Sequence, residues 1–415
     1  MYAFLTISIS SSVIDRGVIV HPEDLRVEVA YAEEYAGDLR GKILLSEEAI
    51  LCTDLERAEE TLNRIRSGGA AEGGTGRGIG SSYAHHYDRL GKKIYDLLDE
   101  GWKETFGKQY ERYEREFAAY GIELKDELVP DFQKTKMEGI NEPRKVGTKE
   151  EFLDRLENAR TWIFERNMVE NVLLLHRDIF NNSSQGVLFE GAQGVGLHPW
   201  LGSYPDVTSS DTSIYGVMSG TGYWKPEDIK QKIGVIKGPY TSSVGRRHLP
   251  TEISLSRENN RLPENATNTQ KRGVFIRDKA RETGTTTGRW RDIAELDLPN
   301  LSYNATVGGI EMLAVTMMDV VQKDETIKVC TYYMRDGKEV PFQPGLRYME
   351  GITPIYVELP GWDGEACRNA KTLDDFPQEA LQYLSFIQAR TGFPIIAVTA
   401  GPERNKLFTA QGYKS

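Results

Sequence analysis

The sequence alternates short apolar runs, rich in β-branched residues, with stretches whose apolar residues recur at helical intervals. The apolar runs are GVLFEG (186–191), KIGVIKG (232–238), EMLAVTMMDV (311–320), TIKVCTYYM (326–334) and FPIIAVTAG (393–401). Strands that alternate with helices favour an α/β fold with a largely parallel central sheet flanked by helices. Several runs end in glycine or a small polar residue, and such sheets bind ligands beyond the carboxyl ends of their strands. We therefore expect the ligand site at that edge of the sheet.

Domain organisation follows from the same pattern. The chain as a whole, residues 1–415, is expected to form a single α/β domain. Residues 100–177 differ, since they are rich in Glu, Lys, Arg and Tyr with apolar residues at helical intervals. This charged helical subregion predicts a peripheral insertion of surface helices around a loop near 129–144. Residues 259–272 are polar without periodicity, so we expect an exposed loop there.

Composition and charge exclude several classes of protein. A formal net charge of −11 argues against broad binding to nucleic acid or to an anionic membrane. The opening MYAFLTISISSSVI has no basic region before its apolar part and is too short to cross a bilayer, so it predicts a strand. The three cysteines lie far apart without a CxxC spacing, which suggests neither a disulfide framework nor a zinc site. We expect a cytoplasmic protein, without membrane or nucleic-acid partners, that holds anionic ligands locally.

The first candidate ligand loop is GGTGRGIG (73–80). Its glycines allow a close approach to a phosphate, and Thr75 and Arg77 offer hydrogen-bond donors. A tight surface turn explains the same residues, because the string matches neither glycine-rich nucleotide-binding motif. Three cations follow this loop: Arg89, Lys92 and Lys93. The adjacent His85 and His86 project differently and have no acidic or cysteine partner at ligand spacing, so we expect solvated histidines and no metal site.

A second candidate loop follows the apolar run at 186–191. Gln193 lies between glycines at the predicted strand end, where its amide can both donate to and accept from a polar ligand. A run of hydroxyl-bearing residues extends from Thr208 to Ser213 and can hold phosphate oxygens. Capping of a following helix also explains these hydroxyls.

The third candidate is RETGTTTGRWRD (281–292). Between and after two glycines it carries three threonines and two arginines: Thr285, Thr286, Thr287, Arg289 and Arg291. The glycines let the backbone curl, and the threonines line that curl with donors. Guanidinium forks bind oxyanions bidentately, so the loop suits a carboxylate or a phosphate. An exposed turn with two solvated arginines is the alternative.

The fourth candidate is AVTMMDVV (314–321), which places Asp319 at the end of an apolar strand. A carboxylate in that position can accept two N–H donors from a guanine-like base. A strand-end Asp is also a common helix N-cap, and the residues alone leave both interpretations open.

Taken in order, seven segments resemble the adenylosuccinate synthetase family, GTP-dependent ligases that join aspartate to IMP in AMP and purine biosynthesis. They are GGTGRGIGSSY, VLFEGAQGVGLHPWLGSYPDVTSSDTS, GVIKGPYTSSVGRRHLPTE, ETGTTTGRWR, AVTMMDVV, PIYVELPGW and AVTAGPER. The similarity runs from about Gly68 to the C-terminus, and this many segments in one order make a specific match. The resemblance implies the fold of that family and a homodimer with shared active sites. It also implies IMP, L-aspartate and GTP as substrates.

The resemblance further implies roles for individual residues. IMP would be bound by Thr75, Arg89, Gln193, Thr208 and Arg289, with Arg89 reaching the phosphate in the neighbouring subunit. Aspartate would be bound by Thr285, Thr286, Thr287, Arg289 and Arg291. GTP would be bound by Arg291, Met317, Met318, Asp319, Thr399, Ala400 and Gly401.

The resemblance also implies a reaction in two steps. In the family an Asp deprotonates IMP so that O6 attacks the γ-phosphate of GTP, a His with Mg²⁺ supports the transfer, and the aspartate amine then displaces phosphate from the 6-phosphoryl intermediate. Those residues belong to GDEGKGK and NxGH strings, and neither string occurs in this chain. The catalytic residues are therefore unknown, the ligands of Mg²⁺ are not in the chain, and we expect the chain to begin downstream of both strings.

Two further differences bear on specificity. Met317 stands where the family has a lysine two residues before the guanine-reading Asp. Arg246, Arg247 and His248 replace small residues of a loop over IMP. Two alternatives stay open beside an IMP ligase: a non-catalytic nucleotide-binding relative, and a ligase that acts on a guanylate-type purine nucleotide.

Overall fold

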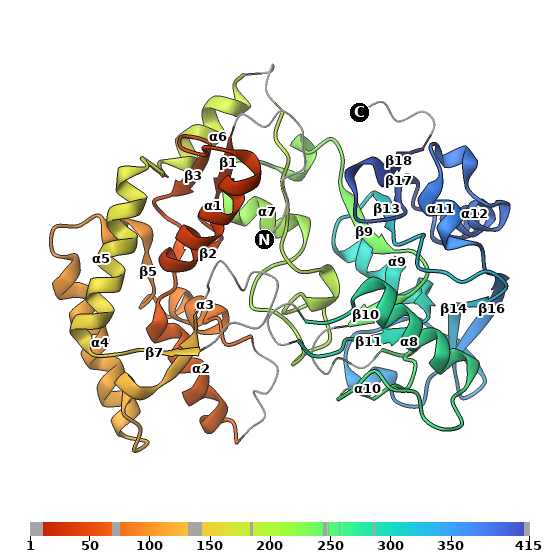
Figure 1. The fold of residues 1–415 in the computed structure, drawn as a ribbon, viewed down its shortest axis with the longest axis horizontal. Coiled ribbons are helices and arrows are strands. Elements are labelled where there is room, and N and C mark those ends of the chain that lie inside the picture. The colour runs from red at the N-terminus through yellow and green to blue at the C-terminus, as the bar shows by residue number, and fades with distance from the viewer. Residues whose placement is uncertain are drawn as a thin grey trace. The chain divides into compact units, whose positions relative to one another are not determined.

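The computed structural model describes residues 11–68, 75–131, 143–182, 186–243, 247, 249–256, 258–284 and 288–410 (Figure 1). The chain divides into two compact units. The first unit comprises Met1–Ala192, Thr208–Ser210 and Gly216–Pro226, and the second comprises Gln193–Val207, Asp211–Tyr215 and Glu227–Ser415. Each unit is described by itself below, and the single domain expected over 1–415 stays a prediction.

The first unit is built on short strands and long helices. Its strands are β1 (Ser12–Ile14), β2 (Ile19–Val20), β3 (Ile43–Ser46), β4 (Ile50–Leu51), β5 (Lys92–Lys93), β6 (Leu128–Pro130), β7 (Pro143–Lys145) and β8 (Val169–Glu170). Its helices are α1 (Pro22–Ala36), α2 (Asp54–Arg66), α3 (Ile79–Tyr87), α4 (Trp102–Ala118), α5 (Lys149–Glu165) and α6 (Val172–Phe180). The strands β1, β3 and β8 form a parallel sheet. In a second sheet β4 pairs in parallel with β2 and antiparallel with β5, and β6 and β7 form a separate antiparallel pair.

The charged helical subregion supplies much of the core of the first unit. Along α4 the buried aromatic residues recur every three or four positions, the spacing of one helix face: Trp102, Phe106, Tyr110, Tyr113 and Phe117. They pack in one cluster with Leu55 and Leu62 of α2 and Phe152 of α5. The helices are thus present as predicted, and they are amphipathic: charged faces are exposed, and the apolar face of each packs into the core, as apolar residues at helical intervals predict. Val129, at the start of the predicted loop, is also fully buried on β6, and residues 132–142 lie outside the described part.

The second unit contains the main parallel sheet. Its strands are β9 (Ile233–Lys237), β10 (Thr241–Ser243), β11 (Asp292–Ala294), β12 (Leu296–Asp297), β13 (Met312–Thr316), β14 (Thr326–Arg335), β15 (Lys338–Val340), β16 (Thr353–Pro360), β17 (Ile395–Thr399) and β18 (Leu407–Thr409). Its helices are α8 (Asn268–Ala280), α9 (Leu298–Val307), α10 (Leu346–Met349), α11 (Gly364–Asn369) and α12 (Gln378–Thr391). Helix α7 (Ile214–Thr221) contributes residues to both units.

Two sheets organise this unit. In the first, β9, β13 and β17 run parallel and β18 closes one edge antiparallel, so the strands lie side by side in the order β18–β17–β13–β9 (Figure 1). In the second, β14 pairs in parallel with β12 but antiparallel with β15 and β16. The apolar face of α12, including Tyr383 and Ile387, packs in one core cluster with residues of β13 and β17. The predicted α/β fold is confirmed, with an antiparallel addition that the alternation did not predict.

Most of the predicted strands are present. The runs at 232–238, 311–320, 326–334 and 393–401 contain β9, β13, β14 and β17, and the end of the opening stretch forms β1. The run at 186–191 contains no strand, and that prediction was wrong: Leu188 is 54% exposed and the run pairs with no strand of the described residues. The predicted loop at 259–272 was wrong at its end, because α8 begins at Asn268 with a Thr267 capping box. None of the described helices has the length and apolar character that a membrane span requires.

Candidate functional site

Three parallel strands of the second unit end at the same edge of the sheet. Lys237 is the last residue of β9, the turn Met317–Asp319 follows β13, and Thr399 is the last residue of β17. The backbone N–H of Met318 donates to the carbonyl oxygen of Thr399 over 3.0 Å. The two segments predicted to read a guanine base are therefore hydrogen-bonded to each other, at the edge where parallel sheets place their ligands.

Asp319 is buried at this edge and is not fully satisfied. The residue is 6% exposed, and Oδ1 has no hydrogen-bond partner among the described residues. Nη1 of Arg368 lies 3.9 Å from Oδ2. Burial raises the pKa of the Asp319 carboxyl, while Arg368 opposes that rise. No helix begins at Asp319, since the next helix along the described chain is α10 (Leu346–Met349), so the alternative of a helix cap is excluded. A buried carboxylate oxygen without a donor is suited to accept N–H groups from a ligand.

The side chains of the neighbouring residues Met317 and Met318 pack against apolar clusters. Met318 is fully buried, and its carbonyl oxygen accepts the indole N–H of Trp362 over 2.8 Å. Met317 adopts a φ of 65° and packs against the small apolar cluster around Tyr240. The side chain of Met318 thus lies in the core, and a GTP contact from this residue would have to come from its backbone.

The loop that carries Arg289 and Arg291 is fixed at its base. A bridge pairs Thr283 with Trp290, and the N–H of Arg291 donates to the carbonyl oxygen of Glu282 over 2.9 Å. Thr285, Thr286 and Thr287 lie outside the described residues. Arg289 is exposed, whereas Arg291 is partly buried and donates from Nη1 to Oε2 of Glu282 over 3.0 Å. The alternative of two solvated arginines is therefore wrong for Arg291.

The base of this loop is also tied to the sheet edge. The Lys237 ammonium at the end of β9 donates to Oε1 of Glu282 and, over 2.6 Å, to the hydroxyl of Ser242. The hydroxyl of Tyr240 donates to the same Oε1 over 2.6 Å. The loop therefore belongs to the same edge as the Asp319 turn. Sequence reasoning missed Glu282 and Lys237, although both stand inside the quoted motifs.

The glycine loop of the first unit packs closely on α2. Thr75 is exposed, and Gly78 has a φ of 73°. A Cβ atom at Gly78 would lie 2.8 Å from Cys52 Sγ and 2.9 Å from the backbone N of Arg57. The N–H of Gly78 donates to Oε1 of Glu60 over 2.6 Å. Packing against α2 thus requires a glycine at position 78. Neither interpretation of the sequence, as a ligand loop or as a surface turn, predicted this structural role.

Helix α3 follows that loop and ends just before Arg89, which is exposed with a φ of 63°. The expectation of solvated histidines was wrong for His85, which is buried with Nε2 3.0 Å from Oε2 of Glu59. Tyr113 also contacts His85, with its hydroxyl 3.3 Å from Nδ1. His86 is exposed as expected. The partners of His85 come from other helices, which no local spacing could reveal.

The remaining IMP-binding candidates belong to different units. Gln193 is exposed with a φ of 68° and lies in the second unit with Arg289, while Thr208 is partly buried and lies in the first with Thr75 and Arg89. A common IMP pocket for these five residues stays a prediction. At the end of the hydroxyl run, Ser213 accepts the N–H of Tyr215 over 3.2 Å at the start of α7, as the helix-capping alternative predicts.

Comparison with known proteins decides the family. The sequence model of the adenylosuccinate synthetase family matches residues 6–408. The chain belongs to the adenylosuccinate synthetase family. The adenylosuccinate synthetase of Citrifermentans bemidjiense is 32% identical over 397 residues, which cover 95% of this chain and 82% of that protein. That of Chlorobaculum parvum is 32% identical over 396 residues, with the same coverage.

A solved structure supports the fold. The structure of the Plasmodium falciparum adenylosuccinate synthetase matches with a TM-score of 0.80 at 24% identity, covering 97% of this chain and 85% of that one. The resemblance seen in the sequence motifs is therefore confirmed for the family and for the fold.

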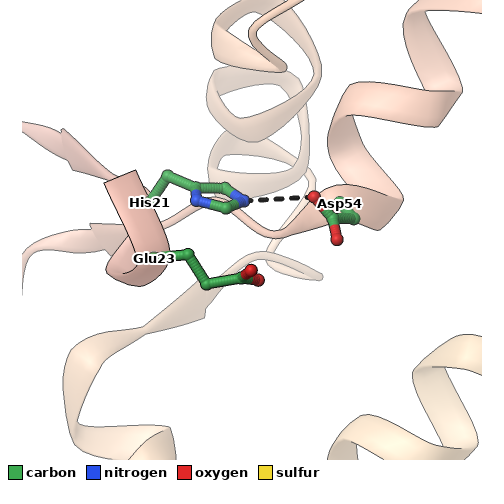
Figure 2. Close-up of side chains that lie close together, drawn as sticks. All are labelled: His21, Glu23 and Asp54. Carbon is green, nitrogen blue, oxygen red and sulfur yellow. Dashed lines mark ion pairs between the residues drawn. The ribbon is translucent and has the colours of Figure 1, made fainter. Parts of the chain in front are cut away.

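The resemblance to adenylosuccinate synthetases implies Mg²⁺, and the described residues contain one cluster of possible metal ligands. One group brings possible ligand atoms of a histidine and two carboxylates within 4.8 Å of one another: His21, Glu23 and Asp54. Figure 2 shows the His21 ring facing the Asp54 carboxylate, with Nε2 3.4 Å from Oδ1.

This cluster does not fit Mg²⁺. Arg144 donates to both oxygens of Asp54, over 2.6 and 3.1 Å, and to Glu23 over 2.8 Å. Arg155 donates to Asp54 as well, over 3.1 Å. The two carboxylates are thus already neutralised by guanidinium groups, which would repel a divalent cation. The cluster is a partly buried ion-pair network that joins α1, α2, β7 and α5.

Proposed function

We propose that this chain is a GTP-dependent ligase that joins L-aspartate to IMP and releases adenylosuccinate, GDP and phosphate. Membership of the adenylosuccinate synthetase family supports the reaction class. The observation that carries the proposal is the buried Asp319 carboxylate, with an unpartnered oxygen, beside the Thr399 turn at the carboxyl edge of a parallel sheet.

Asp319 is proposed to read the guanine base of GTP. Its oxygens accept the ring N–H and the amino N–H of guanine, a pattern that adenine does not offer. The Thr399–Gly401 turn lies next to it, because Met318 and Thr399 are hydrogen-bonded. Gly401 has a φ of 143°, which favours glycine, and a Cβ atom there would lie 2.7 Å from Oε2 of Glu403, so the turn requires a residue without a side chain.

Arg289 and Arg291 are proposed to hold oxyanions of aspartate and of the GTP phosphates. Both follow the loop base that Glu282 and Lys237 attach to β9. Thr75 and Thr208 are proposed to bind the IMP phosphate, Gln193 the edge of the IMP base, and Arg89 the IMP phosphate of a neighbouring subunit in a homodimer. The three buried free cysteines agree with a reducing, cytoplasmic setting.

The proposed chemistry proceeds in two steps. The O6 atom of IMP attacks the γ-phosphorus of GTP, which forms 6-phosphoryl-IMP and breaks the bond to GDP. The amine of aspartate then attacks C6, and phosphate leaves. Phosphorylation is needed because a hydroxyl-type oxygen is a poor leaving group, and the transfer depends on positioning and charge neutralisation. The catalytic base is unassigned, and Mg²⁺ is implied by the family alone.

The experiment measures succinyl-purine formation by the purified protein from IMP, L-aspartate, GTP and Mg²⁺. Product from IMP supports the proposal. Saturable IMP binding without product supports a non-catalytic nucleotide-binding relative, and product from a guanylate but not from IMP supports a ligase of different purine specificity.

A base swap tests the role of Asp319 directly. Asp319→Asn replaces an acceptor by a donor, so GTP affinity should fall about tenfold or more while XTP, which offers a carbonyl oxygen in place of the guanine amino group, gains affinity. Asp336→Asn in the exposed β14–β15 turn is the matched control. Unchanged GTP and XTP affinities in Asp319→Asn would reject base reading by this residue.

A further inference from the structure

Glu282 is a buried carboxylate on which three donors converge. The residue is 1% exposed. Its Oε1 accepts from the Lys237 ammonium and, over 2.6 Å, from the Tyr240 hydroxyl, and its Oε2 accepts from Nη1 of Arg291 over 3.0 Å. Lys237 and Arg291 lower the pKa of the Glu282 carboxyl in spite of its burial, so the group is ionised at neutral pH. Glu282 therefore connects the end of β9 with the last arginine of the candidate loop.

The Arg291 backbone and one side of its guanidinium are fixed by described neighbours. Its N–H donates to the Glu282 carbonyl oxygen over 2.9 Å, and its own carbonyl oxygen accepts from Nε of Arg277 over 2.8 Å, so the backbone is fixed in both directions. The guanidinium uses Nη1 for Glu282. Nε, on the opposite edge, is buried and has no hydrogen-bond partner in the part of the chain that the structure describes, while the side chain as a whole stays 29% exposed.

The orientation of Arg291 leaves the Nε–Nη2 edge of its guanidinium available to a ligand, and this is the edge that binds oxyanions best. Nε and Nη2 share one edge of a guanidinium, and that edge forms paired hydrogen bonds with a carboxylate or phosphate. A buried N–H without a partner costs about as much free energy as a lost hydrogen bond. A ligand oxygen on this edge would accept that N–H and recover the free energy. The geometry thus indicates both the chemistry of the ligand and the edge that it contacts.

The local charge points the same way. The carboxylate of Glu282 faces two cations, Lys237 and Arg291, so this small cluster carries one more positive than negative charge. The pKa of the Lys237 ammonium is lowered, with burial as the largest cause, as expected for a charge that is incompletely compensated. An anionic ligand next to Arg291 would balance the cluster.

We propose that Glu282 is a positioning residue. By accepting a hydrogen bond from Nη1 of Arg291, it orients the Nε edge of the Arg291 guanidinium toward an oxyanion of the substrates. The proposal rests on the proposed function for the identity of that oxyanion, either a phosphate of GTP or a carboxylate of aspartate. Lys237 and Tyr240 hold Glu282 in place for this task.

The test compares binding of oxyanions with binding of the base alone. GTP, guanosine, L-aspartate and tripolyphosphate are titrated calorimetrically into the wild type and into Arg291→Lys and Glu282→Gln. Lysine cannot form the paired hydrogen bonds of a guanidinium, and glutamine lacks the charge that holds Nη1. Glu295→Gln is the matched control, because Glu295 is a similarly buried carboxylate paired with Arg272 elsewhere in the same unit.

If the oxyanion is a phosphate of GTP, both variants should bind GTP about tenfold or more weakly than the wild type while guanosine binding is unchanged, since charged hydrogen bonds contribute on this scale. A weaker affinity for aspartate alone would assign the oxyanion as a carboxylate. Glu295→Gln should lower thermal stability without changing the ratio of GTP to guanosine affinity. If Glu282→Gln does not fold, Glu282→Asp, which keeps the charge but withdraws it from Arg291, serves in its place.

The proposal is overturned if the Glu282 variant binds GTP, aspartate and tripolyphosphate as tightly as the wild type but unfolds at a lower temperature. Glu282 would then have a structural role only. Wild-type affinities of Arg291→Lys would exclude the paired hydrogen bonds. A wild type that binds tripolyphosphate but not guanosine would reject the proposed function, and weaker tripolyphosphate binding by both variants would still support this inference. A wild type that binds none of the oxyanions overturns it.

Discussion

Gly364, the first residue of α11, lies directly against the carbonyl oxygen of Asp319. A Cβ atom at Gly364 would overlap that oxygen and lie 2.7 Å from the carbonyl oxygen of Val321. Both neighbours are backbone atoms, which cannot move aside as a side chain can. The absence of a side chain at Gly364 therefore sets where the Asp319 turn lies, and it connects helix packing to the predicted base site.

Gly364→Ala should displace this turn. Overpacking against backbone costs about 1–3 kcal/mol, so we expect a loss of stability on that scale in urea unfolding and a weaker affinity for GTP. Gly101→Ala, at a glycine with negative φ and no atom near its Cβ position, should change neither quantity by a comparable amount. Unaltered GTP binding in Gly364→Ala would show that the Asp319 turn adapts or does not contact the nucleotide.

A second glycine tests the loop before α3. Gly78 has a left-handed backbone, with φ 73° and ψ 9°, and close contacts to Cys52 Sγ and the backbone of Arg57. Gly392, at the end of α12, has a similar backbone, with φ 77° and ψ −2°, and no described atom near its Cβ position. Alanine at either position incurs the left-handed strain of about 1 kcal/mol. Gly78→Ala should cost at least about 1 kcal/mol more than Gly392→Ala, because only it adds a clash.

The same pair of variants addresses ligand binding. Thr75 precedes Gly78 in the loop proposed to hold the IMP phosphate, so Gly78→Ala should also weaken IMP binding in calorimetric titration, and Gly392→Ala should not. Equal unfolding free energies for the two variants would contradict the packing argument, and equal IMP affinities would contradict the ligand argument.

How far the sequence predicts this molecule depends on the range of the interactions. The strands β9, β13 and β17 were predictable because continuous apolar runs ending in small residues are typical of buried parallel strands. The run at 186–191 has the same composition, yet a strand also needs a neighbour, and composition carries no information about pairing. The antiparallel pairing of β14 with β16 was unpredicted for the same reason.

In the candidate site, too, residues within a recognisable motif were predictable, and residues that depend on distant partners were not. Asp319 and Arg291 were found because each stands in a motif of the family. Glu282 was missed within its own motif, because its importance comes from Lys237, a residue distant in sequence at the end of another strand. His85 was misjudged because its partners lie on α2 and α4. Family resemblance identified the family and the fold, whereas the assignment of the site residues stays a prediction.

Asp297 gives a prediction for acid stability. It is 2% exposed, caps α9 by accepting the N–H of Asn300 over 3.1 Å, and accepts from the Tyr333 hydroxyl. Burial raises the pKa of its carboxyl from 3.8 to about 6. The folded state therefore binds this proton more tightly than the unfolded state, and the free energy of unfolding falls as pH rises between these two values. The shift corresponds to about 3 kcal/mol.

Asp297→Asn removes this titration while keeping an oxygen for both donors. The slope of unfolding free energy against pH between about 4 and 6 should become more positive than in the wild type. Urea unfolding across that range measures the slope, and Asp336→Asn in the exposed β14–β15 turn controls for the loss of one charge. Parallel curves for Asp297→Asn and the wild type would contradict the prediction.

The buried pair His85–Glu59 makes stability depend on pH in the neutral range. The hydrogen bond that the His85 imidazole donates to the Glu59 carboxylate raises the pKa of the imidazole above its usual 6.5, against the effect of burial. Glu56 adds to the rise, while Arg112 of α4 opposes it. A raised pKa of a base means that the stabilisation is complete below the unfolded-state value and is lost as pH rises through the folded-state value. Glu59, whose pKa is lowered by the same contact, loses its contribution only as pH falls below about 4.5.

His85→Gln should therefore be less stable than the wild type near pH 6, by about 1–3 kcal/mol for a charged hydrogen bond, with the difference shrinking toward pH 9. His86→Gln, one residue further along α3 and exposed, is the matched control and should follow the wild type at every pH. Urea unfolding at several pH values in this range measures the differences. A gap between His85→Gln and the wild type that stays constant with pH would mean that His85 stabilises α3 by packing alone, without a charge on its imidazole.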